Sequence, residues 1–374
     1  MTDTTGTSPA ALSELARSSV ALMLRLQDDS GAFVASPTFS AYAGYCWFRD
    51  GAFIADAVSA AGEAESATRF FDWCARVVID RADQIERIVA AAAAGTPLPD
   101  ADMLPTRFTM DGGEGDDEWW DFQLDGYGTW MWAAAAHAQR HGLDIRRWAR
   151  ALDLTARYLV SSWRRPCFDW WEEHDERVHV STLGCIVAGL EAGTDAGVLS
   201  ERDATLAAVD GIRALMESDG RASGHLTKWI GTAEVDGSLA AIVAPLAVFP
   251  AGSPIGSATV DEVLASLEVG GGVYRFRADT YFGGGRWPLL SCFLGLALNA
   301  RGDRAGALRL LEWSAGTADA AGDLPEQVTD LALDPGREEE WTRRWGPVAR
   351  PLLWSHAMYV RLAVELGISA GVSA

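Results

Sequence analysis

The chain has 374 residues, 49% of them hydrophobic, with a formal net charge of −21 and a pI of about 4.6. This composition predicts a soluble globular protein with a large core. It argues against nucleic acids and anionic membrane surfaces as partners, because phosphates are bound by clustered Lys and Arg. Neutral ligands such as sugars are compatible with the charge.

Neither a signal peptide nor a membrane span is expected. The N-terminal segment MTDTTGTSPAALSELARSS has no basic stretch followed by an apolar run. No segment approaches the roughly 18 uninterrupted apolar residues of a transmembrane helix. An odd number of cysteines without close pairing is typical of free thiols in a reducing compartment, and the chain has five: Cys46, Cys74, Cys167, Cys185 and Cys292. We therefore expect a cytoplasmic protein.

Helical periodicity dominates the chain from its N-terminal end onward. Ser8-Pro9 is a capping residue followed by a first-turn proline, and the apolar residues after it recur at helical spacing. In chain order, twelve helices are predicted near residues 8–27, 51–61, 64–94, 124–141, 145–163, 180–192, 200–218, 237–248, 259–269, 287–300, 303–320 and 351–366. Alternation typical of β-strands is scarce, with short candidates at 177–180 and 273–276.

The connections between these helices are strongly uneven. Each even-numbered helix is joined to the next by a short link, although the link at 250–258 is somewhat longer. The odd-to-even links are long and rich in Trp, Gly, Asp and Glu, at 44–50, 113–128, 167–174, 225–236, 273–288 and 322–350. Nine of the 16 tryptophans fall in these six loops: Trp47, Trp119, Trp120, Trp170, Trp171, Trp229, Trp287, Trp341 and Trp345. In a closed ring of alternating helices all six loops lie at one end, where function is expected.

This asymmetry predicts an all-α fold, an (α/α)6 barrel of six helical hairpins with long catalytic loops at one end. We expect residues 1–374 to form this single domain. A helical solenoid is the alternative architecture, although no solenoid repeat motif is present.

Two groups in the first two long loops suit recognition of a sugar. Arg49-Asp50 opens a helix directly after aromatic residues, and together a guanidinium and a carboxylate can hold neighbouring hydroxyls. An Asp at a helix start is also an ordinary cap. The tryptophan pair that ends at Trp120 precedes Gln123 and Asp125, which combines flat apolar platforms with an amide and an acid. Packing of the pair beneath a capping Asp is the structural alternative.

Two glutamates from different long loops are candidate catalytic acids. In CFDWWEEH, residues 167–174, two tryptophans directly precede Glu172 and Glu173, and Glu326 lies in the sixth long loop. Burial by the tryptophans and the like charge of Glu173 both raise the pKa of Glu172, as a general acid near neutral pH requires. Glu326 is expected to stay ionised and activate water. Two opposed carboxyl groups in an aromatic pocket are what glycoside hydrolysis needs.

Metal and phosphate chemistry compete with this interpretation. His137 and His141 stand four residues apart on one predicted helix, a spacing that zinc can use, but no third ligand accompanies them. The glycines at 283–285 lack the surrounding phosphate-loop motif, and we expect them to let the backbone approach a ligand next to the fixed charges of Arg275 and Asp279. We expect neither a metal nor another cofactor.

Five motifs in order carry a resemblance to a known family. GYCWFRD, WWDFQLDGYG, DWWEEH, RFRADTYFGGGRWP and LPEQ, between about residues 40 and 360, resemble glycoside hydrolase family 15. This is the glucoamylase family of inverting exo-α-glucosidases on an (α/α)6 barrel. The resemblance implies that Glu172 is the general acid and Glu326 the general base. It implies substrate contacts for Arg49, Asp50, Trp47, Trp120, Glu173, Arg275 and Trp287. From the pattern of the loops we also expect Gln123, Asp125 and Trp171 to bind substrate.

The chain also departs from the family pattern. It has room for neither the N-terminal β-sandwich of many bacterial relatives nor a starch-binding module. These absences favour short α-glucosides, with isomaltose and isomaltooligosaccharides ahead of maltooligosaccharides. A trehalase on the same fold and a sugar-binding protein without turnover are the alternatives. The sequence leaves open the linkage, the chain length, the oligomeric state and the roles of the acidic rim loops 111–118 and 331–349.

Overall fold

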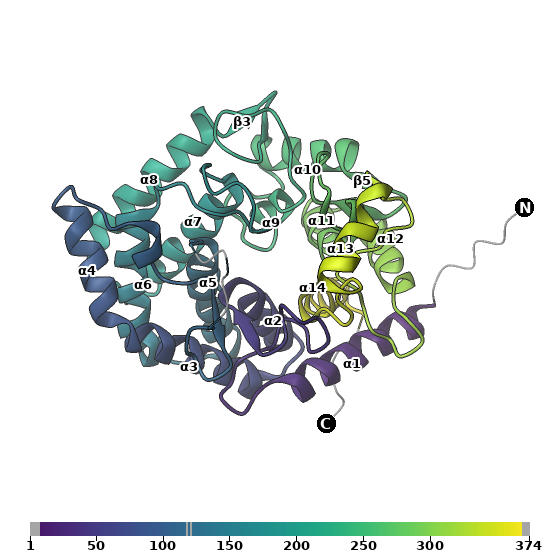
Figure 1. Cartoon of the computed structure of the whole chain (residues 1–374), viewed down its shortest axis with the longest axis horizontal. Helices are drawn as coiled ribbons and strands as arrows, with labels where there is room; N and C mark the ends of the chain where they lie inside the picture. The colour runs from purple at the N-terminus through teal and green to yellow at the C-terminus, as the bar shows by residue number, and fades with distance from the viewer. Residues whose placement is uncertain (1–7, 117–118, 120–121, 369–374) are drawn as a thin grey trace, which may run out of the picture.

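The computed structural model describes residues 8–116, 119 and 122–368, which fold into two concentric layers of helices around a common centre (Figure 1). The inner layer consists of α2 (Phe48–Ala60), α5 (Asp125–His141), α7 (Val180–Asp195), α9 (Leu239–Val243), α11 (Pro288–Ala300) and α14 (Leu353–Glu365). Each inner helix packs against the next, and α14 packs back against α2. The ring is therefore closed, as in an (α/α)6 barrel, and the solenoid alternative is wrong.

The inner helices are buried on almost every side. In α11 every residue from Pro288 to Leu298 is buried, which explains its nearly unbroken apolar sequence. Glycines let neighbouring helices approach closely: a Cβ on Gly128 of α5 would lie 2.2 Å from the carbonyl oxygen of Cys185 of α7. Any side chain at this position would push the two helices apart.

The outer helices are α1 (Pro9–Leu26), α3 (Ala64–Asp80), α4 (Ala82–Ala93), α6 (Ala149–Ser162), α8 (Arg202–Ser218), α10 (Pro254–Ser266) and α12 (Arg304–Gly316). They are amphipathic, because one face of each packs against the neighbouring helices; for α4 these neighbours are the outer helices α6 and α3. In α8 the buried residues recur at helical spacing from Thr205 through Ile212 to Met216. Along the chain, fully buried inner helices therefore alternate with outer helices that are buried on one face only.

The predicted loop asymmetry is confirmed. The segments from an inner helix to the next outer one are short, whereas each segment that enters an inner helix is long. All the long segments therefore lead to the N-terminal ends of inner helices. Short antiparallel pairings brace them: β1 (Tyr45–Trp47) with β2 (Arg107–Thr109), β3 (Arg221–Ala222) with β4 (His225–Leu226), and β6 (Gly272–Tyr274) with β5 (Glu268–Val269) and β7 (Arg286–Trp287). The 3-10 turns are η1 (Asp100–Asp102), η2 (Ile145–Trp148), η3 (Tyr281–Gly283) and η4 (Pro335–Arg337).

Three predicted helices differ most from those observed, while the others match to within about four residues at each end. The helix expected at 64–94 is divided into α3 and α4 at Arg81, whose side chain bonds the carbonyl oxygens of Val77 and Gly112. The helix expected at 237–248 ends at Val243, because Ala244 precedes a proline and is extended. The helix expected from 259 begins earlier, at Pro254, where the Ser253 hydroxyl caps the Gly256 amide at 3.0 Å.

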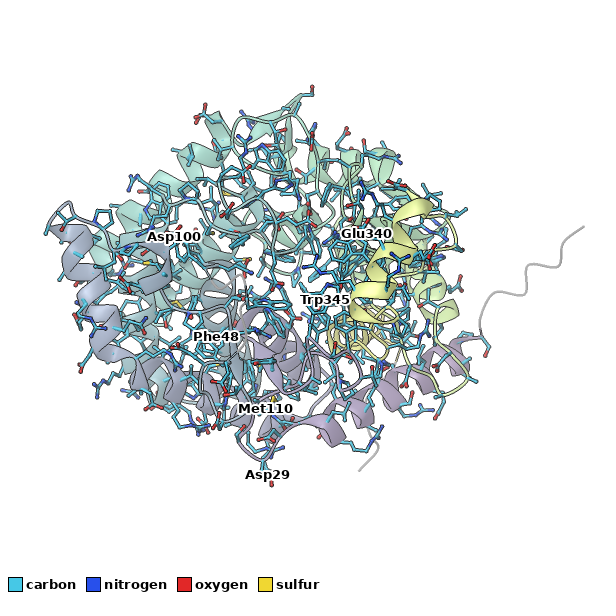
Figure 2. The ribbon with its side chains drawn as sticks, viewed as in Figure 1. Asp29, Phe48, Asp100, Met110, Glu340 and Trp345 are labelled. Carbon is cyan, nitrogen blue, oxygen red and sulfur yellow. The ribbon has the colours of Figure 1, made fainter. Side chains whose placement is uncertain are left out.

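One helix was missed in the long segment at 322–350. Helix α13 (Glu338–Trp345) has no buried residue, so it lacks the apolar stripe by which helices are recognised. It lies across one side of the ring opening, and its C-terminal Trp345 is nearer the centre than Glu340 (Figure 2). Among the helices of the described residues, none is long and apolar enough to cross a membrane.

Candidate active site

A cavity of about 330 Å³ opens at the end of the barrel that carries the long loops. Five of the six long segments contribute to its wall, and the described part of the fourth, which precedes α9, contributes no lining residue. The cavity brings Glu172 and Glu326 together, from the third and sixth long segments. The predicted residues Trp47, Arg49, Asp50, Trp171, Glu173, Arg275 and Trp287 also line it.

Aromatic rings form most of the remaining wall. Trp171 and Trp287 lie side by side with ring centroids 5.4 Å apart, and Trp47 meets Trp119 edge-on at 5.8 Å. Predicted Trp120 lies outside the described residues, whereas its neighbour Trp119 lines the cavity. Flat apolar faces beside polar groups match a sugar ring, which presents C–H faces and a rim of hydroxyls.

Arg49 and Asp50 occupy the first turn of α2 at the pocket wall. Arg49 Nε lies 3.4 Å from Asp50 Oδ2, and both residues are buried. Gln123 and Asp125, predicted to touch substrate, do not line the cavity; they accept hydrogen bonds from Arg49 Nη1 at 2.8 and 3.2 Å. Their observed contacts hold the guanidinium in place. Within the described residues Asp50 Oδ2 is buried and has no hydrogen-bond partner, so its ion pair with Arg49 is its one polar contact there.

Glu172 projects into the pocket from a turn with an unusual backbone. Its φ of 62° lies in the left-handed region, which residues other than glycine rarely adopt. The indole N–H of Trp47 donates to Glu172 Oε1 at 2.6 Å. Burial raises the pKa of Glu172 to about 7, against the opposing effects of the Arg49 charge and the Trp47 hydrogen bond. The carboxyl group is thus partly protonated near neutral pH.

Glu326 is more deeply buried, at 2% exposure, and has a different set of partners. The Tyr42 hydroxyl donates to its Oε1 at 2.9 Å, and its Oε2 has no hydrogen-bond partner among the described residues. Burial raises the pKa of Glu326 to about 7 as well, despite the Tyr42 hydrogen bond and the charge of Arg275. Burial therefore acts on both carboxyl groups, and the ionised state expected for Glu326 stays a prediction.

Several residues of the site were missed by the sequence analysis. Tyr42 links the two sides of the pocket: its hydroxyl lies 3.2 Å from that of Tyr281, and its ring packs against Trp47. Burial raises the pKa of Tyr42 well above its usual value, so its hydroxyl stays a neutral donor. On α13, Trp341 and Trp345 stand four residues apart and both line the cavity. Their spacing on one helix face was the available signal.

The charged residues of the fifth long segment contact both the pocket wall and each other. Arg275 Nη2 lies 3.1 Å from Glu173 Oε1, and the same guanidinium pairs with Asp279. The glycines at 283–285 do not line the pocket, although we expected them to let the backbone approach a ligand. Gly285 instead donates its amide to Gln327 Oε1 at 2.7 Å, and a Cβ there would lie 2.5 Å from that oxygen. They bring the fifth segment against the loop that carries Glu326.

The two histidines considered for zinc lie apart from the pocket. His137 Nδ1 lies 2.8 Å from Ser59 Oγ, and its Nε2 lies 2.9 Å from Thr68 Oγ1. Both ring nitrogens are therefore occupied by hydroxyl groups. In the part of the chain that the structure describes, no cluster of three or more His, Cys, Asp or Glu side chains could hold a metal ion.

A closed helical barrel, an aromatic pocket and a pair of carboxyl groups inside it are together typical of a carbohydrate-active enzyme. The family model described as glycosyl hydrolases family 15 matches residues 9–317, and the chain belongs to this family. It is therefore a glycoside hydrolase on an (α/α)6 barrel. The match ends before Glu326, whose place in the pocket rests on the structure.

Comparison with individual proteins identifies relatives of this chain within the family. The chain is 52% identical over 362 residues to a protein of Kribbella flavida named isomaltose glucohydrolase, which covers 96% of this chain and 94% of the relative. It is 24% identical to an uncharacterised glycosyl hydrolase of Methanocaldococcus jannaschii, over 92% of this chain and 54% of that protein.

Solved structures agree with this placement. A structure titled as a wild-type glycosidase matches with a TM-score of 0.94 at 51% identity, over 96% of this chain and 98% of that one. A variant of it in complex with glucose matches equally well. The glucoamylase of Saccharomycopsis fibuligera, at 14% identity and a TM-score of 0.68 over 99% of both chains, shares the fold.

Proposed function

We propose that this protein is an inverting exo-α-glucosidase that releases β-D-glucose from the non-reducing end of short α-glucosides, with isomaltose and isomaltooligosaccharides preferred. One observation carries the proposal: two carboxyl groups with raised pKa values, Glu172 and Glu326, line one small aromatic pocket beside Arg49 and Asp50. The inverting mechanism is the one used throughout the family.

In the mechanism, Glu172 and Glu326 act on opposite sides of the scissile bond. Protonated Glu172 gives its proton to the glycosidic oxygen as the bond to the anomeric carbon breaks. Ionised Glu326 accepts a proton from water, whose oxygen attacks the anomeric carbon from the other face. The configuration inverts, so β-glucose is released. Glu172 has then lost one proton and Glu326 has gained one, and exchange with solvent restores both.

Polar atoms without partners in the pocket wall support removal of a terminal glucose. Asp50 Oδ2 and the indole N–H groups of Trp287 and Trp354 lack hydrogen-bond partners among the described residues, and all three side chains line the cavity. Buried polar atoms without partners are costly, so a ligand with many hydroxyls would relieve them. The non-reducing-end glucose fits this requirement because it carries hydroxyls around its rim.

The preference for short substrates rests on the size and the mouth of the pocket. Its volume of about 330 Å³ lies at the low end of the roughly 300–1,000 Å³ typical of ligand pockets. Trp341 and Trp345 of α13 stand at the wall, and Arg344 covers both rings at 5.6 and 5.2 Å from their centroids. The preference for α-1,6 linkages rests on the similarity to the isomaltose glucohydrolase of K. flavida.

We further propose that residues 1–374 act as one catalytic domain in the cytoplasm. The closed ring formed by the described residues supports a single domain. All five cysteines are buried and free, which is typical of proteins from reducing compartments.

The test is proton NMR of the anomeric signals during hydrolysis of isomaltose, maltose and trehalose, with Glu326→Ala beside the wild type. We expect β-glucose to appear first from isomaltose, more slowly from maltose, and not from the variant. Early α-glucose alone would exclude inversion. Both anomers formed at once from trehalose, with no turnover of isomaltose, would identify a trehalase instead. Binding of isomaltose without turnover would identify a sugar-binding protein.

A further inference from the structure

The fourth long segment contributes no described residue to the pocket wall, yet it contains a fully buried ammonium group. Lys228 is 2% exposed, and its Nζ lies 3.0 Å from Asp169 Oδ2 and 2.6 Å from Asp236 Oδ2. Both carboxylates are equally buried. Burying three charges is costly, and an apolar cluster of similar volume is often as stable. The cluster of Lys228, Asp169 and Asp236 therefore calls for a role other than stability.

Asp169 connects this charged cluster to the turn that carries Glu172. Its Oδ1 accepts the backbone amides of Trp171 at 2.9 Å and Glu173 at 3.0 Å, on either side of Glu172. Its carbonyl oxygen accepts the Glu172 amide at 3.0 Å. One aspartate thus holds three successive amides, and this clamp maintains the left-handed backbone at Glu172.

Asp236 holds the same turn through a side chain. Its carboxylate accepts the indole N–H of Trp171, with distances of 3.0 and 3.2 Å to its two oxygens. Trp171 precedes Glu172 directly and lines the pocket. Lys228 lies between the two aspartates and compensates their charges. It thereby connects the clamp that Asp169 makes on the backbone amides to the clamp that Asp236 makes on the Trp171 side chain.

We propose that Lys228 is a positioning residue, which holds Glu172 in proton-transfer geometry by joining the clamps that Asp169 and Asp236 make on the 169–173 turn. This proposal rests on the proposed function, in which Glu172 is the general acid. Lys228 itself touches neither the pocket nor a substrate. Its effect is therefore expected on the step in which Glu172 gives up its proton, and not on binding.

Two substrates with different leaving groups separate this role from a general loss of structure. The alcohol released from isomaltose needs a proton from the general acid, whereas fluoride leaves α-D-glucosyl fluoride without one. General acid catalysis contributes roughly 10²–10⁴-fold. We expect Lys228→Met to lower kcat on isomaltose by about 10²-fold, to change KM little, and to lower kcat on α-D-glucosyl fluoride by less than about threefold.

Arg361→Met is the matched control. Arg361 Nε lies 2.9 Å from Asp56 Oδ2, which is as buried as Asp169, but neither residue lines the pocket. This variant should lose thermal stability while keeping the wild-type ratio of the two activities. Asp236→Asn retains an acceptor for Trp171 and weakens the contact with Lys228, so it should shift the ratio in the same direction by less. It also provides a test if Lys228→Met fails to fold.

Equal losses of activity on both substrates in Lys228→Met would overturn the proposal, and so would an unchanged ratio of the two activities in Asp236→Asn. The cluster of Lys228, Asp169 and Asp236 would then have a structural role only. Restoration of isomaltose turnover by Lys228→Arg, which keeps the charge, would support it. If the wild type hydrolyses neither substrate, the proposed function fails and not the role of Lys228.

Discussion

The two loops that carry Glu172 and Glu326 hold their carboxyl groups in contrasting ways. The Glu172 turn is held by buried charges and places its glutamate in a left-handed conformation. The Glu326 loop is held by hydrogen bonds in which backbone carbonyls accept: the Glu326 amide donates to Ala349 O at 2.9 Å, the Ser355 hydroxyl of α14 donates to Pro325 O at 2.8 Å, and the Arg350 guanidinium donates to Asp323 O at 2.9 Å. Burial raises the pKa of both glutamates to about 7.

Because burial raises both pKa values alike, the two carboxyl groups differ instead in their loop frameworks and in their hydrogen-bond partners. Glu172 takes its hydrogen bond from an indole N–H, whereas Glu326 takes its bond from a phenol and keeps Oε2 free among the described partners. A free oxygen can accept a proton from water. The different partners of the two carboxyl groups are consistent with the proposed division into acid and base.

The largest expected effect comes from removing each carboxyl group in turn. Glu172→Gln should lower kcat on isomaltose by about 10³-fold, within the range for general acid–base catalysis, but retain most turnover of α-D-glucosyl fluoride. Glu326→Gln should lower turnover of both substrates, because both need activated water. Steady-state rates on the two substrates test this difference. The opposite pattern would exchange the two roles.

The pH dependence is the next largest effect. Activity on isomaltose requires Glu172 protonated and Glu326 ionised. With both pKa values raised to about 7, kcat/KM should peak near pH 7. It should fall about tenfold per pH unit well outside the peak, in acid as Glu326 gains a proton and in alkali as Glu172 loses one. With α-D-glucosyl fluoride the alkaline fall should disappear. A fall on the alkaline side for both substrates would contradict the assignment of Glu172.

A smaller effect is expected at the pocket mouth, on α13. Trp345→Ala removes an aromatic wall that packs against Trp119 and Phe39, with centroids 6.4 and 6.5 Å away. We expect KM for isomaltose to rise about fivefold, corresponding to about 1 kcal/mol of lost aromatic contact. The kcat/KM for α-D-glucosyl fluoride, which has no second sugar, should change less than twofold. Equal changes on both substrates would place Trp345 outside the part of the site that contacts the second sugar.

The smallest effect on the catalytic step is expected from His356, which holds the Glu326 loop in place. His356 Nε2 accepts the Leu324 amide at 2.9 Å, so the ring carries its proton on Nδ1 and donates to Ser19 Oγ at 2.8 Å. Burial lowers the pKa of His356 to about 3, which keeps the ring neutral. His356→Ala leaves a buried amide unpaired and should lower the free energy of unfolding by about 1–3 kcal/mol.

Denaturant unfolding measures this loss. The activity that remains at low temperature should fall equally on isomaltose and α-D-glucosyl fluoride, in contrast to the selective loss expected for Lys228→Met. A selective loss on isomaltose in His356→Ala would show that the two loop frameworks are not independent.

Much of the pocket could be predicted from the sequence, because its residues lie in long loops whose composition differs from that of the helices. Glu172 and Glu326 stand in Trp-rich or acidic stretches between helices, and the structure brings both into one cavity. Tyr42 and α13 could not be found in this way. A tyrosine in a long loop resembles many core tyrosines, and an eight-residue helix without buried residues has no apolar period.

The sequence by itself determined the alternation of inner and outer helices, the end of the barrel that carries the long loops, and the candidate carboxyl groups. These features depend on local periodicity and on loop length. The tertiary structure alone decided that Gln123 and Asp125 hold Arg49 and that Lys228 joins Asp169 to Asp236. It also decided that burial raises the pKa of Glu326 as well as that of Glu172. Such properties depend on which side chains surround a group, and those neighbours come from segments far apart in the chain.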